Sequence, residues 1–234
     1  MQNNPFKHYR FSPGIILCAV RWYCRYALSC RDVRDLPAER GIDVYASTIH
    51  RRARKFGPEI AKRSIKHWSW RGLNWHVDET YIRVGEKWRY LWRAVDQRGQ
   101  LIDCRLTARR DVMAAKAFLK QAWENVRLCQ PRPITTDKAH SYARVFGEMS
   151  RFELPGEDIL HINRKWENNR IESDHAALKK LITQMRGFKS LSSAKATLRG
   201  TEAIRTIKHG HVHGKSPGVT GEIRFVEGLF GLAA

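Results

Sequence analysis

The sequence predicts an α/β protein in which a small helical domain precedes a larger domain built on a mixed sheet. Apolar residues in the first 60 positions recur at spacings of three and four, which indicates amphipathic helices. From residue 73 the apolar residues alternate, as in half-buried strands, and later helical and strand patterns follow one another. We expect a helical domain with a basic connector over residues 1–68, the α/β domain over residues 69–212 and a C-terminal tail over residues 213–234.

Three helices are expected in the first domain. The first has an apolar face made of Ile15, Ile16, Ala19, Val20, Tyr23 and Ala27. Ser29 is a suitable N-cap for a second helix over residues 30–40, which is predicted to end at Gly41. A third helix is predicted over residues 46–56, because Gly57-Pro58 is a typical helix stop.

The larger domain begins with a predicted meander. Its three strands cover residues 73–84, 88–96 and 101–107 and are joined by turns at Gly85-Glu86 and Arg98-Gly99. Beyond them we expect helices over residues 111–128, 139–149, 167–185 and 192–209 and short strands over residues 133–136 and 159–162. A meander followed by alternating helices and strands predicts a sheet with both antiparallel and parallel neighbours.

The composition is strongly basic. The chain has 43 Lys or Arg against 23 Asp or Glu, a formal net charge of +20. Residues 1–75 contain 15 Lys or Arg against 5 acids, whereas residues 76–234 contain 28 against 18, so the charge is densest in the first third. Nucleic acid is the expected partner, because each phosphate that is neutralised releases counterions. An anionic membrane surface is the second candidate, but no polybasic amphipathic segment supports it.

Membrane and disulfide-rich classes are excluded. The longest apolar stretch, from Gly14 to Val20, is far shorter than the roughly 20 residues that span a bilayer. The five cysteines are odd in number and include no Cys-x-x-Cys pair, which argues against a disulfide framework and a zinc ribbon. We therefore expect a cytoplasmic protein.

The second and third predicted helices and the short turn between them form the pattern of a helix-turn-helix. The side chains expected to face a DNA groove are Ser47, Thr48, Arg51 and Arg52. The alternative is an ordinary three-helix unit with a solvated basic face. Pro37 fits the pattern poorly, because it removes a backbone hydrogen bond inside the second helix.

Three carboxylates occupy chemically suggestive places in the larger domain. Asp78 lies in the first strand, where alternation puts it on the face opposite Glu79. Asp137 follows the short strand over residues 133–136, at a carboxyl end where α/β sheets bind ligands. Glu172 lies near the start of the long helix over residues 167–185.

Helical spacing defines the surroundings of Glu172. Asn168, His175 and Lys179 share its stripe, whereas Asp174 is turned about 200° away and is expected to lie outside a site that Glu172 builds. Two aspartates on neighbouring strands and a glutamate on a covering helix are a donor set for two Mg²⁺ ions. Such a pair activates a water or a 3′-hydroxyl for phosphodiester displacement. Any one of the three acids alone is more often a surface acid or a cap.

The order of the elements resembles the ribonuclease-H-like fold, and the acids resemble the Asp-Asp-Glu triad of transposases and retroviral integrases. The closer resemblance is to the transposases of bacterial insertion-sequence family six, and it runs along most of the chain. The matching residues include Val20-Arg21-Trp22-Tyr23, Ser47-Thr48-Ile49, Trp75-His76, Asp78-Glu79-Thr80-Tyr81, Arg93-Ala94-Val95-Asp96, Thr136-Asp137-Lys138-Ala139, Ile171-Glu172, Asp174-His175 and Gly187-Phe188-Lys189-Ser190. The 34 residues between Asp137 and Glu172 are the interval expected for that family.

The resemblance implies a helix-turn-helix domain followed by a ribonuclease-H-like catalytic domain. Asp78, Asp137 and Glu172 would be the catalytic residues and would hold two Mg²⁺ ions, for which Mn²⁺ would substitute. Lys179, seven residues after the glutamate, would hold a phosphate. The partners would be double-stranded DNA, at the element's terminal inverted repeats and at the target, and a second copy of the chain. Movement would be replicative, in a nucleoid-associated bacterial protein.

Other interpretations stay open at this point. The chain can be a catalytically silent DNA-binding regulator that retains the fold, or a ribonuclease-H-type or junction-resolving nuclease. His209, His211 and His213 alternate near the C-terminus and can bind a metal, although a solvated tail is the commoner use. Trp166 can stack on a base or pack at a helix end.

Overall fold

The computed structural model describes residues 4–69, 74–126, 133–136, 142, 145, 160–163, 169–185 and 187–232. The chain forms two compact units. The helical unit comprises Met1–Ser69, Leu181–Arg186 and Ser192–Ala234, and the sheet unit comprises Trp70–Lys180 and Gly187–Leu191. These limits differ from the predicted domains, because segments near both ends of the chain share the helical unit.

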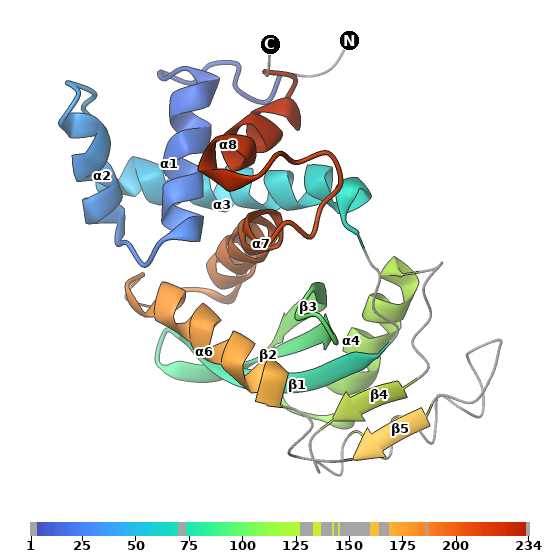
Figure 1. The fold of residues 1–234 in the computed structure, drawn as a ribbon. Helices are drawn as coiled ribbons and strands as arrows, with labels where there is room; N and C mark the ends of the chain where they lie inside the picture. Colours follow the sequence, from blue (N-terminus) through green and yellow to red (C-terminus); the bar gives the residue numbers. More distant parts are fainter. Residues whose placement is uncertain are drawn as a thin grey trace. The chain divides into compact units, whose positions relative to one another are not determined.

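The helical unit contains α1 (Pro13–Arg25), α2 (Cys30–Ala38), α3 (Ala46–Ser64), the 3₁₀ turn η1 (Ile65–His67), α7 (Leu191–Lys208) and α8 (Gly218–Gly228) (Figure 1). One apolar core joins them: Val20, Ile49 and Phe56 of the N-terminal helices are buried together with Ile204 of α7 and Val226 of α8. The segment expected to be a tail therefore contains a helix that helps to bury the N-terminal core.

The start of α2 follows the local chemistry that the sequence predicts. The Ser29 side chain accepts hydrogen bonds from the backbone N–H groups of Arg31 and Asp32, and the Asp32 carboxylate accepts one from the Ser29 N–H at 2.7 Å. This capping box satisfies donors that the first turn of a helix leaves without partners. Pro37 lies in the last turn of α2, so little of the helix follows the hydrogen bond that it removes.

The predicted end of the third helix is wrong. α3 continues through Gly57-Pro58 to Ser64, with Ile60 and Ser64 fully buried beyond the proline. Gly57 serves a different purpose from a cap, because it lies against Gly200 of α7: a Cβ atom on Gly200 would lie 2.7 Å from the Cα of Gly57. The two glycines let the helix backbones approach closely, and burial of the following turns offsets the hydrogen bond that Pro58 removes.

We predict that Gly200→Ala lowers the free energy of unfolding by about 1–3 kcal/mol, although alanine is the better helix former by about 1 kcal/mol. The added methyl group would meet the Gly57 backbone, which has no flexible atom to move aside. Urea unfolding of the full chain measures the effect. Lys195→Ala, at an exposed position of α7, is the control and should change stability by less than about 0.5 kcal/mol. A Gly200→Ala protein as stable as the parent would contradict the close approach.

The sheet unit contains a five-stranded mixed sheet in the order β3-β2-β1-β4-β5. Its strands are β1 (Trp75–Val84), β2 (Lys87–Asp96), β3 (Leu101–Thr107), β4 (Pro133–Thr136) and β5 (Leu160–Asn163). β1, β2 and β3 pair antiparallel, whereas β4 is parallel to β1 and β5 is parallel to β4. This arrangement confirms the predicted meander and mixed sheet, and its strand order is that of the ribonuclease-H-like fold.

Residues of β1 alternate between the two faces of the sheet. Trp75 and Val77 point to a core that also contains Phe118 of α4 (Val112–Asn125). His76, Asp78 and Thr80 point to the other face, where side chains of α6 (Asn169–Thr183) meet the sheet. The alternation therefore decides which residues of β1 are available to a site under α6. The predicted helix over residues 139–149 lies outside the described residues, apart from Tyr142 and Val145.

Candidate active site

Asp78 is held at the middle of the sheet, on the central strand β1. Its side chain is 16% exposed, and its Oδ2 atom lies 3.6 Å from Nδ1 of His175 on α6. His175 is buried, so the imidazole fills the space between the helix and the strand. The Asp78 carboxylate is therefore in contact with His175 and remains partly accessible to solvent.

Glu79 lies on the opposite face, as the alternation predicts. The Tyr142 hydroxyl donates a hydrogen bond of 2.8 Å to its Oε2 atom, and Arg110 pairs with its Oε1 atom. Because these partners belong to the face that carries α4, Glu79 is a structural acid, and its exclusion from the site of Asp78 is confirmed.

Arg93 is the residue of this region that the sequence analysis missed. It is the cross-strand partner of Asp78 on β2, it is 1% exposed, and its guanidinium forms an ion pair with Asp174 of α6. Asp174 therefore packs against the sheet through this ion pair, and its expected absence from the set of metal ligands stays a prediction. The angle between Asp174 and Glu172 is as predicted, but the face that bears Asp174 is the one that packs on the sheet. A lone arginine within the buried part of a strand was the signal that a carboxylate must reach it.

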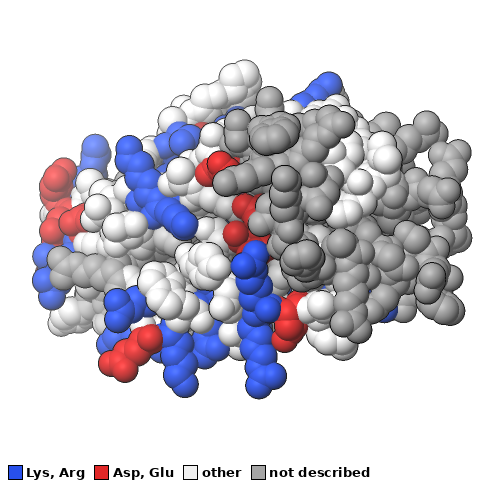
Figure 2. Space-filling view, turned by 90° about the horizontal axis from the view of Figure 1, so that it is seen from below, with Lys and Arg blue, Asp and Glu red and all other residues white. Residues whose placement is uncertain are grey.

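The remaining candidates on α6 lie at the surface. Glu172 and Lys179 are exposed, and His175 between them is buried. Glu172 precedes His175 by one helical turn, so the contact between His175 and Asp78 places the exposed acid on the part of α6 next to Asp78. Figure 2 shows Asp and Glu side chains standing among Lys and Arg side chains on one face of the molecule. Such a mixture suits a site that binds both cations and phosphates.

Asp137 and Trp166 lie outside the described residues. The strand that leads to Asp137 ends at Thr136, which pairs in parallel with Val77, the residue before Asp78. Thr136 is also tied to β5, because its Oγ1 atom lies 2.8 Å from Nε2 of His161. Burial lowers the pKa of His161, so the imidazole is uncharged at neutral pH.

The donor set suits a hard divalent cation. Asp78 and Glu172 present carboxylate oxygens with access to solvent, which are the ligands that Mg²⁺ prefers. Within the part of the chain that the structure describes, no three His, Cys, Asp or Glu side chains are grouped closely enough to hold a metal. A complete site would thus need a further ligand, and the sequence offers Asp137. The histidines near the C-terminus form no such group either.

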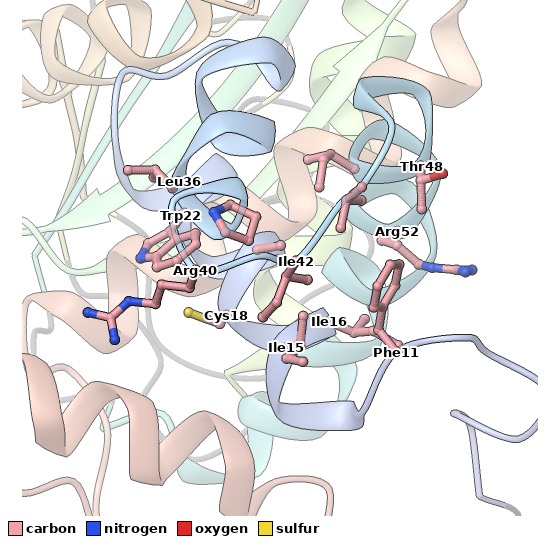
Figure 3. A pocket seen from close by; sticks show the side chains of 14 residues that line it. Phe11, Ile15, Ile16, Cys18, Trp22, Leu36, Arg40, Ile42, Thr48 and Arg52 are labelled. Atoms are coloured by element: carbon pink, nitrogen blue, oxygen red, sulfur yellow. The ribbon is translucent and has the colours of Figure 1, made fainter.

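The residues expected to read DNA lie on α3 and differ in their surroundings. Ser47 and Arg51 are exposed, and the Arg51 guanidinium donates a hydrogen bond of 3.2 Å to Thr48 Oγ1. Arg52 is half-buried, with its guanidinium 3.8 Å from the centre of the Tyr9 ring, and burial lowers its pKa. Thr48 and Arg52 border an apolar pocket of about 110 Å³ between α1, α2 and α3, and the Arg52 guanidinium points away from it (Figure 3).

Comparisons with known proteins identify the family of this chain. Residues 72–211 match a family model described as a DDE domain. The chain is 34% identical over 202 residues to the transposase for insertion sequence-like element IS431mec of Staphylococcus aureus, a match that covers 86% of this chain and 87% of that one. It has the same identity and coverage with the transposase for insertion sequence element IS257 in transposon Tn4003 of the same species.

Two solved structures that are similar to part of this chain come from retroviral proteins. The catalytic core domain of HTLV-2 integrase in complex with magnesium has a TM-score of 0.44 at 18% identity, covering 64% of this chain and 95% of that one. The intasome of simian T-cell lymphotropic virus gives 0.45 at 20% identity, covering 61% and 52%.

The sequence matches define an enzyme of the Asp-Asp-Glu type, and the mixed sheet is consistent with this class. The chain belongs to the transposases of insertion-sequence family six.

Among the helices that the structure describes, none combines the length and the apolar character of a membrane-spanning segment.

We predict that Asp174→Asn destabilises the protein by about 3 kcal/mol, because it removes the carboxylate charge that pairs with the buried Arg93 guanidinium. Urea unfolding of the full chain measures the loss. Glu172→Gln, at an exposed acid of the same helix, is the control and should leave the unfolding midpoint unchanged. The double variant Arg93→Met/Asp174→Leu should recover much of the loss, because it removes both charges. Equal midpoints for Asp174→Asn and Glu172→Gln would contradict the role of the ion pair.

Proposed function

We propose that this transposase binds the terminal inverted repeats of an insertion sequence, cleaves the DNA at the ends of the element and joins the freed 3′-hydroxyl to target DNA. The observation that carries the proposal is the position of Asp78. It lies on the central strand with its side chain 16% exposed, and α6 carries Glu172 one turn before the residue that contacts Asp78. Mg²⁺ bound there would activate the attacking hydroxyl and stabilise the leaving oxygen. The relatives from Staphylococcus aureus are named as transposases of insertion sequences, which supports the same activity for this chain.

The residues of the site have separate tasks in this proposal. Asp78, Asp137 and Glu172 would together hold the two Mg²⁺ ions. His175 orients the Asp78 carboxylate through the contact at 3.6 Å. Asp174 holds the Arg93 guanidinium and thereby seats α6 on the sheet.

The helical unit would supply sequence recognition. Ser47, Thr48 and Arg51 lie on the first turns of α3, which follows α2 after seven residues, Glu39 to Tyr45. In a helix-turn-helix these turns enter the major groove. Arg52 is braced on Tyr9, so its guanidinium has less freedom than that of the exposed Arg51. Assembly of two copies on two ends and replicative movement belong to the same proposal and follow the family resemblance.

The first test concerns the metal ligands. Asp78→Asn, Asp137→Asn and Glu172→Gln should each reduce end cleavage and strand transfer by at least about 10³-fold, because each removes one ligand charge from a shared site. Binding of end DNA should persist. End-labelled duplexes with Mg²⁺, Mn²⁺ or a chelator measure the reaction, which should require a metal.

Glu124→Gln, at an exposed acid of α4, is the control and should react like the parent. Strand transfer by any one of the three ligand variants would refute the assignment. A parent protein that binds end DNA yet never cuts it would instead identify a silent regulator.

Lys179 is proposed to hold a phosphate beside the metal site. It follows Glu172 by two turns, so its ammonium group lies about 10 Å along the same side of α6. We predict that Lys179→Ala slows single-turnover end cleavage by about tenfold or more, which corresponds to 1.4 kcal/mol of transition-state stabilisation. Lys180→Ala is the matched control, because Lys180 is also exposed but lies about 100° round the helix. Equal cleavage rates for the two variants would leave Lys179 without a role in the reaction.

A further inference from the structure

A large basic cleft lies in the helical unit, away from the first turns of α3. It is formed by the C-terminal half of α3, by η1 and by the segment from residue 213 to residue 231, which includes α8, and its volume is about 740 Å³. The cleft exists because α3 continues beyond Gly57-Pro58, since Lys62 and Lys66 follow those residues. It is far too large for a single ion and has the size of a site for an extended ligand.

The charges of the cleft are mostly positive and mostly unneutralised. Four Lys or Arg side chains line it, against one carboxylate, that of Glu59. Arg63 donates a hydrogen bond of 2.7 Å to Glu59 and another of 3.1 Å to the carbonyl oxygen of Leu229, so this pair joins α3 to the end of α8. Lys62, Lys66 and Arg224 are exposed, and no ion pair links any of them to another residue that the structure describes.

The wall of the cleft leaves room for the backbone of a bound polymer. Gly214, Gly228 and Gly231 line it, are exposed and present no side chains, so a ligand can approach the polypeptide closely. His67 and His213 add ring nitrogens that can donate hydrogen bonds. Cations spaced around an open, glycine-lined cleft suit a chain of phosphodiester groups, which carry one negative charge each.

One side of α3 connects this cleft to the turns proposed to read DNA. At helical spacing Thr48, Arg51, Lys55 and Lys62 lie within about 60° of one another around the axis of α3, and Lys66 follows in η1. Thr48 and Lys62 are 14 residues apart, which is about 21 Å along the helix. A duplex of DNA presents several phosphates on each strand over that distance.

We infer that the cleft binds the sugar–phosphate backbone of the DNA whose terminal repeat is read at the first turns of α3, through Lys62, Lys66 and Arg224. The inference rests on the proposed binding of terminal repeats by the helical unit. It adds a second, sequence-independent contact that involves the C-terminal helix α8. Binding here raises affinity for any duplex and leaves the discrimination between sequences to Ser47, Thr48 and Arg51.

The experiment compares three full-length proteins: the parent, Lys62→Ala/Lys66→Ala/Arg224→Ala, and the control Lys195→Ala/Arg199→Ala/Lys208→Ala, which removes the same charge from exposed positions of α7. Fluorescence anisotropy measures binding of cognate and scrambled end duplexes without Mg²⁺, from 50 to 300 mM salt. The slope of log affinity against log salt should become less steep by about 2 to 3 for the cleft variant, at about 0.9 for each phosphate contact. Its affinity for both duplexes should fall by the same factor, on the order of tenfold or more, with the ratio between them preserved.

Equal slopes for the cleft variant and the control variant would overturn the inference, and they would point to an acidic protein segment as the ligand of the cleft. A cleft variant that loses discrimination between the two duplexes would also overturn it, because the contact would then read bases. Failure of the proposed function is a separate result: the parent itself would bind cognate and scrambled ends equally. Arg51→Ala provides the complementary reference, since the loss of a base contact weakens binding of the cognate duplex alone, by roughly 5- to 150-fold.

Discussion

The packing of the sheet unit depends on one buried charge, that of Arg93. Arg93 is 1% exposed in the sheet, and a guanidinium without a partner at that depth would cost several kcal/mol. Asp174 of α6 supplies the partner, so α6 can pack on the sheet only where this carboxylate reaches β2. That requirement fixes the residues on either side of Asp174. His175 meets Asp78, and Glu172 comes to the surface one turn earlier. The ion pair between Arg93 and Asp174 thus determines both how α6 packs on the sheet and where the candidate ligands Asp78 and Glu172 lie.

The same ion pair affects the electrostatics around Asp78. Arg93 is the cross-strand neighbour of Asp78, and a positive charge at that position would attract the carboxylate and oppose a divalent cation nearby. The negative charge of Asp174 partly neutralises the guanidinium, which weakens both its attraction for Asp78 and its repulsion of a cation. Asp78 can therefore act as a metal ligand although the buried Arg93 lies next to it on β2. This argument explains why an acid that is no metal ligand in the proposed site lies so close to it.

The helical unit depends on a comparable contact between distant segments. Arg25 of α1 donates two hydrogen bonds, of 2.6 and 3.1 Å, to the carboxylate of Glu222 on α8, 197 residues away in the sequence. Arg21 lies 3.7 Å from the same carboxylate, and Glu222 is 4% exposed. A buried carboxylate held by two arginines makes α8 part of the N-terminal unit. The C-terminal segment thereby forms one wall of the basic cleft, and it was expected to be a tail because nothing in its local sequence reveals the arginines that it meets.

Local chemistry explains which features were predictable from the sequence. The N-cap of α2 at Ser29, the strands β1 to β3 and their tight turns depend on neighbouring residues, and the structure agrees with the prediction at each. The alternation of β1 likewise separated Asp78 from Glu79 before any contact was known. Gly57 was misinterpreted, and the ion pair of Asp174 was missed, for the opposite reason. A glycine before a proline ends most helices, and only Gly200, on a helix far along the chain, shows why this one does not. Likewise the outward or inward direction of Asp174 depends on Arg93, since a helical wheel gives the angle between two residues but not which of them faces the sheet.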